Sequence, residues 1–402
     1  MITPGPVRRT TLVALMVGIV LITGCAGSVS PSGSGPQPSA SGTPAVVGPS
    51  PSAFSPTPTS TPTGIPTEPS TALSPPPTAS TAPSPAGSPL AATWTELSPS
   101  GDVPAAREDH TWTVDASGRY AYLFGGRFGG EVYRDLWRYD LESDAWEELA
   151  PEGDGPRLRF GHTGTWVEGV GLVIWSGQTG SSFYDDIWAF DPEEGSWREL
   201  PGAGERPDAR YGSCAALGND GRLWVSHGFT SDGRFDDTRA YDFAAGRWMD
   251  ETPASEKPIQ RCLHDCLWTP EGRLLLYAGQ TNGDSWLTDL WSLVPGGGET
   301  PTAWTGLGAQ APPGRNLYAL ARQQEQALIF GGIGPGGDRL DDLWALSFAE
   351  LSFRSVDVTG AGPSARSGAT MIDDRTRDRV LLFGGRTTDA ALADIWQLDL
   401  RA

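Results

Sequence analysis

Six arginines recur in the second part of the chain, and each is followed by an aspartate 27 or 28 positions later. The arginines are Arg107, Arg159, Arg210, Arg261, Arg315 and Arg366, and the aspartates are Asp135, Asp186, Asp237, Asp289, Asp342 and Asp394. A planar guanidinium group binds a carboxylate through two parallel hydrogen bonds. The arginines are therefore candidates for binding an acidic ligand. The alternative is that each arginine pairs with the aspartate of its own repeat as part of the scaffold. Guanidinium groups that are exposed to solvent would favour ligand binding, and buried ones would favour the scaffold.

Aromatic and basic residues stand in the segments where the repeated stretches differ most from one another. We select as candidate binding residues Arg127, Phe128, Tyr184, Phe229 and Trp286. Aromatic side chains next to Gly, Ser, Thr and Asn suit either sugar stacking or a protein-binding hot spot. The alternative is that these loops pack on one another.

Three histidines, His110, His162 and His264, each follow a repeated arginine by three residues. Three such rings could hold a metal, but the other repeats carry Ser213, Tyr318 and Ala369 in the same place. We therefore interpret the histidines as structural and expect neither a metal nor another cofactor. The chain also lacks a nucleophile elbow, a phosphate-binding loop and a HExxH helix, so no catalytic residue is assigned.

Cysteines are few, and three of the four lie within the repeats. Cys214, Cys262 and Cys266 allow one disulfide in an oxidising compartment, with three possible pairings. A bond from Cys214 to either of the others would join two neighbouring repeats, whereas Cys262 to Cys266 would staple a local turn.

The elements that must position these residues repeat with a period near 51 residues. After each arginine comes a short apolar stretch that ends in one or two glycines, such as Leu328 to Gly332. After a variable loop comes an aspartate, followed two positions later by a tryptophan except at Arg239, and an aromatic residue closes the unit. Short apolar runs between Gly, Asp and Pro turns predict strands, and no segment has a helical period.

The pattern resembles the kelch repeat over residues 93–402, and thus the central domain of galactose oxidase-type proteins. The resemblance implies an all-β fold, a six-bladed propeller with four-stranded blades. The repeated section starts with a fourth-strand sequence at Trp94 and ends after a third strand at Asp399. We therefore expect an N-terminal fourth strand to close the ring. In kelch proteins the repeated arginines border the channel mouth, and in some they contact acidic peptides.

The first 92 residues have a different composition, with 19 of the 35 prolines and none of the 16 tryptophans. Residues 1–24 contain Arg8 and Arg9 and then an apolar run that is too short to span a bilayer, which is typical of a signal peptide. The run ends in Leu21 to Cys25, which resembles the lipobox of bacterial lipoproteins. This resemblance implies that Cys25 is lipidated. Residues 26–92 are rich in Pro, Ser and Thr, and we expect a disordered stalk over 25–92 and a propeller over 93–402.

Charge limits the classes of partner. The chain carries 29 basic and 49 acidic residues, a formal net charge of −20, which argues against a nucleic-acid binder. We expect an extracytoplasmic, monomeric module, held at the membrane by the lipid on Cys25, that binds a protein, an acidic peptide or a glycan. The alternative is a carbohydrate-acting enzyme, a sugar isomerase or oxidase on a kelch propeller. Fold alone does not decide between them.

Overall fold

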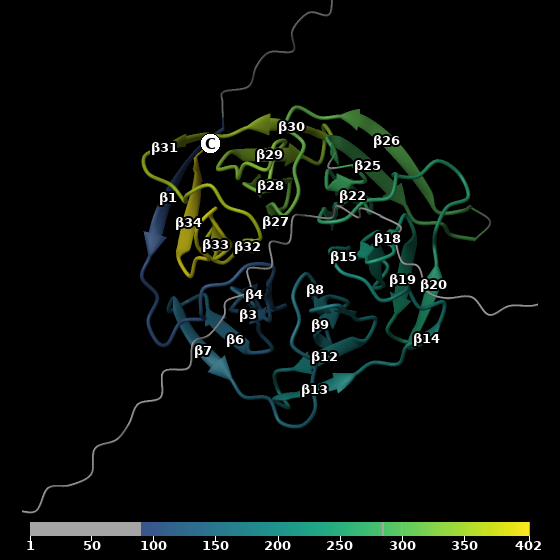
Figure 1. Ribbon diagram of the computed structural model, residues 1–402, viewed down its shortest axis with the longest axis horizontal. Helices are drawn as coiled ribbons and strands as arrows, with labels where there is room; N and C mark the ends of the chain where they lie inside the picture. The colour runs from purple at the N-terminus through teal and green to yellow at the C-terminus, as the bar shows by residue number, and fades with distance from the viewer. Residues whose placement is uncertain (1–89, 284, 299, 402) are drawn as a thin grey trace, which may run out of the picture. The chain divides into compact units, whose positions relative to one another are not determined.

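The computed structural model describes residues 90–283, 285–298 and 300–401. The signal peptide, Cys25 and the stalk predicted above lie outside these ranges. The described chain is all-β, and six sheets of four or five strands form a ring (Figure 1). The six-bladed propeller predicted from the repeats is confirmed. Within the described ranges, no helix is long and apolar enough to cross a membrane.

The first three blades follow one another along the chain. Blade 1 consists of β2 (Thr111–Val114), β3 (Tyr120–Phe124), β6 (Leu136–Asp140) and β7 (Ala145–Leu149). Blade 2 consists of β8 (Thr163–Val167), β9 (Gly171–Trp175), β12 (Ile187–Asp191) and β13 (Ser196–Glu199). Blade 3 consists of β15 (Cys214–Leu217), β16 (Leu223–Ser226), β19 (Thr238–Asp242) and β20 (Arg247–Asp250), with β14 (Ala203–Gly204) as a short parallel fifth strand.

The last three blades complete the ring. Blade 4 consists of β21 (Asp265–Trp268), β22 (Leu274–Tyr277), β25 (Asp289–Val294) and β26 (Ala303–Ala309). Blade 5 consists of β27 (Ala319–Arg322), β28 (Gln326–Phe330), β29 (Leu343–Ser347) and β30 (Ser352–Ser355). Blade 6 consists of β32 (Thr370–Asp374), β33 (Arg379–Phe383), β34 (Ile395–Arg401) and β1 (Ala91–Leu97), with β31 (Asp357–Thr359) on its outer edge.

Blade 6 joins the two ends of the described chain. Strand β1 pairs antiparallel with β34 along its whole length, from Ala91 opposite Arg401 to Leu97 opposite Ile395. In Figure 1 the blue β1 lies beside the yellow β34. The predicted closure by an N-terminal fourth strand is therefore confirmed, and the outer edge of β34 is covered.

The hydrophobic core lies between blades rather than at the axis. Six buried clusters each combine side chains of two neighbouring blades, one cluster for each blade interface. Trp137 of β6, for example, packs in the cluster with Leu381 and Phe383 of β33. Large apolar residues thus fill the wedge between adjacent twisted sheets, and Trp291, Trp344 and Trp396 pack against three of the other clusters.

The glycine pairs mark the exit from each second strand. The second position has φ between 88° and 115° in all six repeats, and a Cβ there at Gly126 would lie 2.8 Å from the Cβ of His110. Only glycine fits such a position. The first position has φ between 56° and 66°, which other residues also adopt, and three repeats have Ser176, His227 and Ala278 there.

Short hairpins follow these glycines in the first four blades. They are β4 (Arg127–Phe128) with β5 (Glu131–Val132), β10 (Gln178–Thr179) with β11 (Ser182–Phe183), β17 (Phe229–Thr230) with β18 (Gly233–Arg234), and β23 (Gln280–Thr281) with β24 (Ser285–Trp286). In each blade the residue after the arginine pairs with the residue after the second glycine, as Tyr211 does with Phe229. One face of the ring, the mouth face, is thus formed by the arginine segments and these variable loops.

Candidate functional site

The six repeated arginines lie inside the blades. Their side chains are between 0% and 2% exposed, and each forms an ion pair with the repeated aspartate of its own blade. In blade 2, Arg159 donates from Nη1 and Nη2 to the two Asp186 carboxylate oxygens at 2.7 and 2.8 Å. It also donates from Nη1 to the Ser176 carbonyl at 2.8 Å and from Nε to the Arg157 carbonyl at 3.0 Å.

The aspartates bind a second donor on the next strand. The indole Nε1 atoms of Trp137, Trp188, Trp291, Trp344 and Trp396 each donate to the aspartate two residues earlier. In blade 3, Arg239 replaces the tryptophan, and its Nε donates to Asp237 at 3.2 Å. Burial opposes the charged form of Asp186, but the hydrogen bonds and charge of Arg159 outweigh it and hold the pKa of the carboxyl below its ordinary value.

These contacts correct the assignment of the arginines as binding residues. Arg107, Arg159, Arg210, Arg261, Arg315 and Arg366 belong to the scaffold, because their donors are used by carboxylates and carbonyls within each blade and solvent does not reach them. A buried guanidinium group needs such partners, since burying a charge without them is costly.

A closed collar of backbone hydrogen bonds surrounds the axis, two residues after each arginine. Each collar residue donates its N–H to the carbonyl of the collar residue in the preceding blade, at 2.7 to 3.1 Å, and the six bonds run from Asp109 round to Gly368 and back. All six have φ between 51° and 65°, and they are Asp109, Gly161, Gly212, Leu263, Leu317 and Gly368. Because every blade contributes one donor and one acceptor, the collar couples the blades at the mouth.

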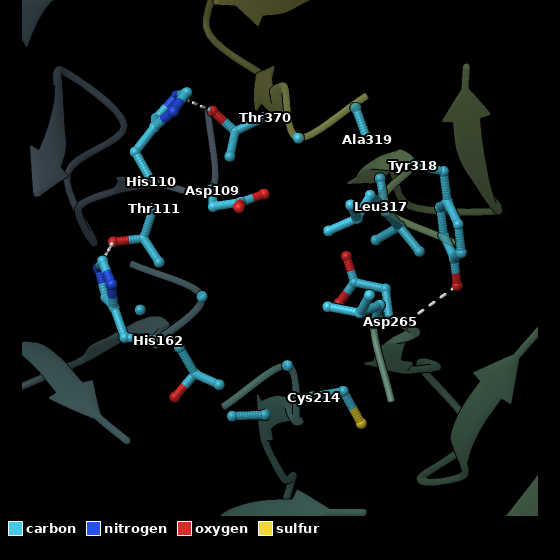
Figure 2. Close-up of a pocket in the computed structure, with 18 of the residues that line it drawn as sticks. Asp109, His110, Thr111, His162, Cys214, Asp265, Leu317, Tyr318, Ala319 and Thr370 are labelled. Carbon is cyan, nitrogen blue, oxygen red and sulfur yellow. Dashed lines mark hydrogen bonds between the residues drawn. The ribbon is translucent and has the colours of Figure 1, made fainter. Parts of the chain in front are cut away.

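The collar and the first strands line a cavity of about 300 Å³ on the axis of the ring. Figure 2 shows the carboxylates of Asp109 and Asp265 pointing into it from opposite walls. Threonines and Ser213 line part of it, and Leu317, Ala319 and Met371 form an apolar part. The cavity is therefore polar and acidic on some walls and apolar on another.

The histidines point toward neighbouring blades. The His110 Nε2 atom lies 2.8 Å from the Thr370 hydroxyl, and the His162 Nε2 atom lies 3.0 Å from the Thr111 hydroxyl (Figure 2). Burial, with the charge of Arg159, lowers the pKa of His162 to about 3, so its ring is neutral.

His264 lies at the boundary between blades 3 and 4, its ring packing edge-on against His227. The three histidines therefore do not converge on the axis. Within the described ranges, no group of three or more His, Cys, Asp or Glu residues could hold a metal ion.

Asp265 is the carboxylate of the cavity that no ion pair neutralises within the described ranges. The hydrogen bond to its side chain comes from the N–H of Cys266, at 3.0 Å. Burial raises the pKa of Asp265 to about 7. On the facing wall, Asp109 is compensated by Arg127, whose Nη2 lies 2.8 Å from its carboxylate.

Three arginines gather above the collar on blades 1, 5 and 6. We call Arg127, Arg339 and Arg386 the arginine arc. Both Arg127 and Arg386 lie 3.5 Å from the Glu108 carboxylate, and the Arg386 side chain is 43% exposed. Burial and the charge of Arg386 lower the pKa of Arg339. Burial and Asp109 raise the pKa of Glu108 to about 7 despite the three arginines.

An aromatic patch adjoins the arc on blades 2 and 3, and consists of Phe160, Phe183, Tyr211 and Phe229. Their ring centroids lie 5.7 to 6.4 Å apart in the contacting pairs. The Arg127 guanidinium lies over the Phe160 ring at 4.1 Å, which joins patch and arc. Phe160 and Tyr211 are buried, so the mouth face presents the arc together with the half-buried Phe183 and Phe229.

The loop residues predicted to bind differ in their position and exposure. Arg127 belongs to the arc and Phe229 to the patch, and Phe128 is 40% exposed at the tip of its hairpin. Trp286 is partly buried on β24. Tyr184 is partly covered, because the Arg159 guanidinium lies 4.4 Å from its ring centroid.

The structure selects one of the three disulfide pairings. Cys214 on β15 is bonded to Cys266 on β21, and the bond joins the first strands of blades 3 and 4. Cys262 is fully buried and lies outside this bond.

Asp109 and Asp265 were missed by sequence reasoning, although the repeats contain a signal for both. Asp109 stands where three other repeats have glycine, and Asp265 stands where three have threonine, namely Thr111, Thr163 and Thr370. A charged residue at a position that is otherwise small or neutral is a departure from the scaffold pattern.

Comparison with known proteins identifies the repeats. Residues 90–279 match the family described as the KLHDC2/KLHL20/DRC7 kelch-repeats domain. This range holds β1, blades 1 to 3 and the start of blade 4, and the same marks continue through blades 5 and 6. Residues 90–279 of the propeller are therefore similar to kelch repeats.

The similar curated proteins differ in what their names describe. Putative adagio-like protein 2 of Oryza sativa subsp. japonica is 28% identical over 337 residues, 77% of this chain and 52% of that protein. N-(sulfonatooxy)prop-2-enimidothioate sulfolyase of Thlaspi arvense is 32% identical over 190 residues, 42% of this chain and 54% of that protein. Leucine-zipper-like transcriptional regulator 1 of Mus musculus is 23% identical over 268 residues, 64% of this chain and 31% of that protein. The chain spans about half the length of the first two.

Proposed function

We propose that this kelch-repeat propeller is a protein-binding module whose mouth face docks a partner segment that carries both acidic and apolar side chains. The observation that carries this proposal is the contact between the arginine arc and the aromatic patch on one face. Aromatic residues and arginine are the side chains that most often dominate binding energy at protein interfaces. The formal net charge of the chain is −20, and Arg127 already pairs with Glu108 and Asp109. Arg386, whose side chain is 43% exposed, is therefore the arc residue that offers an acidic segment a place to bind.

A peptide fits this face better than a glycan does. Sugar stacking needs an open aromatic ring face, but Arg159 lies over Tyr184, Arg127 lies over Phe160, and Arg210 lies over Phe235 at 3.7 Å. The patch residues also pack edge-on against one another. The surface therefore offers ring edges and guanidinium groups, which suit protein side chains.

We also propose that the propeller is carried outside the cytoplasm on a lipid attached to Cys25. Support comes from the order of basic residues, short apolar run and small residue before the cysteine, followed by a long Pro, Ser and Thr tract. Mass spectrometry of the N-terminal peptide from the natural host should find a diacylglyceryl thioether on Cys25. An unmodified thiol there would overturn the anchoring.

The docking proposal is tested with an array of peptides in which acidic and aromatic residues alternate, applied to the full-length protein. The Arg386→Ala variant should weaken binding of the retained peptides about 10-fold or more, because a hydrogen bond to a charged group contributes about 1.5 to 3 kcal/mol. The control is Arg119→Ala, which removes an exposed arginine from the turn between β2 and β3. Equal loss in both variants, or retention of no peptide, would contradict the proposal.

A further inference from the structure

We propose that the channel cavity is a binding site for an alkylammonium group, which the carboxylate of Asp265 holds. The site is distinct from the docking surface proposed above, because no residue of the arginine arc or of the aromatic patch lines the cavity. The ammonium group could come from a free alkylamine or from a lysine side chain of a partner.

The charge of the cavity wall favours a cation. The lining includes the carboxylates of Asp109 and Asp265, and it includes no lysine or arginine. Its histidines are neutral, because burial lowers the pKa of His110, His162 and His264. Arg127 already compensates Asp109 at 2.8 Å. Asp265, which takes part in no ion pair within the described residues, is therefore the carboxylate that a ligand would neutralise.

Neighbouring contacts hold Asp265 in place. Its backbone N–H donates to the Tyr318 hydroxyl at 2.9 Å (Figure 2). That hydroxyl donates to the Tyr277 carbonyl at 2.8 Å. The next residue, Cys266, is bonded to Cys214 of blade 3. Strand β21 is thus fastened to blades on both sides, and the carboxylate is preorganised, which reduces the entropy lost on binding.

The chemistry of the walls fits an organic cation better than a metal ion. A structural metal site needs several converging ligands, and no group of three or more His, Cys, Asp or Glu residues that could hold a metal occurs in the described ranges. An ammonium group has three donors and needs one carboxylate with a few hydroxyl or carbonyl acceptors. The apolar part of the wall, Leu317, Ala319 and Met371, can contact methylene groups. A cavity of about 300 Å³ is at the small end for organic ligands, so the amine must be short.

Calorimetric titration of the full-length protein at pH 8, where Asp265 with its pKa of about 7 is ionised, in a buffer without amines, tests the site. The probes are n-butylamine for a free amine and Nα-acetyl-lysine methylamide for a lysine side chain, with n-butanol as the neutral control. We expect saturable binding of at least one amine and none of butanol. If the lysine derivative binds, a lysine side chain of a partner can supply the ammonium group. If butylamine alone binds, the ammonium group comes from a free amine. The absence of saturable amine binding would overturn the proposal.

Two variants connect binding to the carboxylate. Asp265→Asn should weaken amine binding about 10-fold or more, because it keeps the shape and removes the charge. Asp265→Thr introduces the residue that blades 1, 2 and 6 carry at this place, so the scaffold accommodates it even if the asparagine variant does not fold. The matched control is Asp154→Asn, which removes one exposed charge outside the cavity. Unchanged affinity in a folded Asp265 variant would overturn the proposal, whereas loss of peptide docking in Arg386→Ala would leave it intact.

Discussion

At the scale of single residues, the molecule depends on one ion pair that is used six times. Each repeated arginine joins the segment before the first strand to the aspartate before the third strand, and it also binds two backbone carbonyls. Breaking a buried pair by removing one partner costs more than the pair contributes, since the remaining charge keeps its burial penalty. The arginines are therefore needed for stability rather than for recognition.

Arg159→Met should lower the free energy of unfolding by about 3 to 5 kcal/mol, because it leaves Asp186 without its partner. Arg159→Lys should lower the free energy of unfolding by less, because a lysine keeps the charge. It should still lower it, because a lysine cannot bind both carboxylate oxygens and both carbonyls. Urea unfolding followed by tryptophan fluorescence measures the change. Arg119→Ala, which breaks an exposed pair with Asp140, is the control and should change stability by less than about 1 kcal/mol. Equal effects at the two sites would refute the scaffold role.

Asp265 should make stability depend on pH in a definite direction. Burial raises the pKa of Asp265 in the folded protein to about 7, so between about pH 4 and pH 7 the folded state binds a proton that the unfolded state releases. The free energy of unfolding therefore falls as the pH rises through this window, because the buried carboxyl becomes charged. Asp265→Asn should raise Tm by a few degrees at pH 8 and leave it nearly unchanged at pH 5, as scanning calorimetry in amine-free buffer would show. The same shift at both pH values, or one matched by Asp154→Asn, would speak against it.

At the scale of elements, the blades are joined by different devices at different interfaces. Apolar clusters fill every interface, the backbone collar links all six first strands, and the disulfide between Cys214 and Cys266 joins β15 to β21. At the interface of blades 6 and 1, Arg379 of β33 donates to Asp144 in the turn of blade 1 at 2.6 Å and to Asp374 at 2.8 Å. These links hold rigid the first strands that carry Thr370, Thr111 and Asp265.

Reduction of the disulfide should destabilise the propeller without unfolding it at room temperature. A bond that spans 52 residues typically contributes about 2 to 4 kcal/mol, and the strand pairing of blades 3 and 4 does not depend on it. We expect a lower Tm in the presence of a phosphine reductant. The double variant Cys214→Ser, Cys266→Ser should already have the lower Tm and should not respond to the reductant. A wild-type Tm that is insensitive to reduction would show that the bond contributes nothing.

At the scale of the whole ring, stability depends on joining its two ends. Strand β1 covers the edge of β34, and Trp94 packs against Phe330 of blade 5 with ring centroids 5.3 Å apart. Without β1, blade 6 would expose an edge strand and part of the apolar cluster that it shares with blade 5. Closure therefore links the most distant segments of the described chain.

Deletion of residues 93–98 should lower Tm sharply and reduce the cooperativity of unfolding, because it removes most of one strand and opens the ring. Trp94→Ala is the milder version and should cost about 3 to 5 kcal/mol, the usual range for truncating a buried tryptophan. Thermal unfolding monitored by circular dichroism measures both. An unchanged transition in the deletion variant would mean that the ring does not need this strand.

The sequence by itself determined the repeat, the number of blades, the all-β class and the closing strand, because the arginine, the second glycine and the aspartate occur at the same place in every repeat. Few residue types can take the place of the glycine at φ near 90° or of the aspartate that accepts from an indole. The same residues therefore recur in the sequence and can be recognised there. Arg239 is visible as an exception for the same reason.

The tertiary structure alone decided what the repeated arginines do, which cysteines pair and where Asp109 and Asp265 lie. A guanidinium group can face solvent or a carboxylate 27 residues away, and which of the two it does depends on whether the side chain is buried. The spacing of Arg and Asp along the sequence does not fix that burial. The collar and the cavity are formed by residues about 50 positions apart, brought together by the ring and not by any local pattern. For that reason the acidic cavity is a property of the folded ring, in which the six first strands surround one axis.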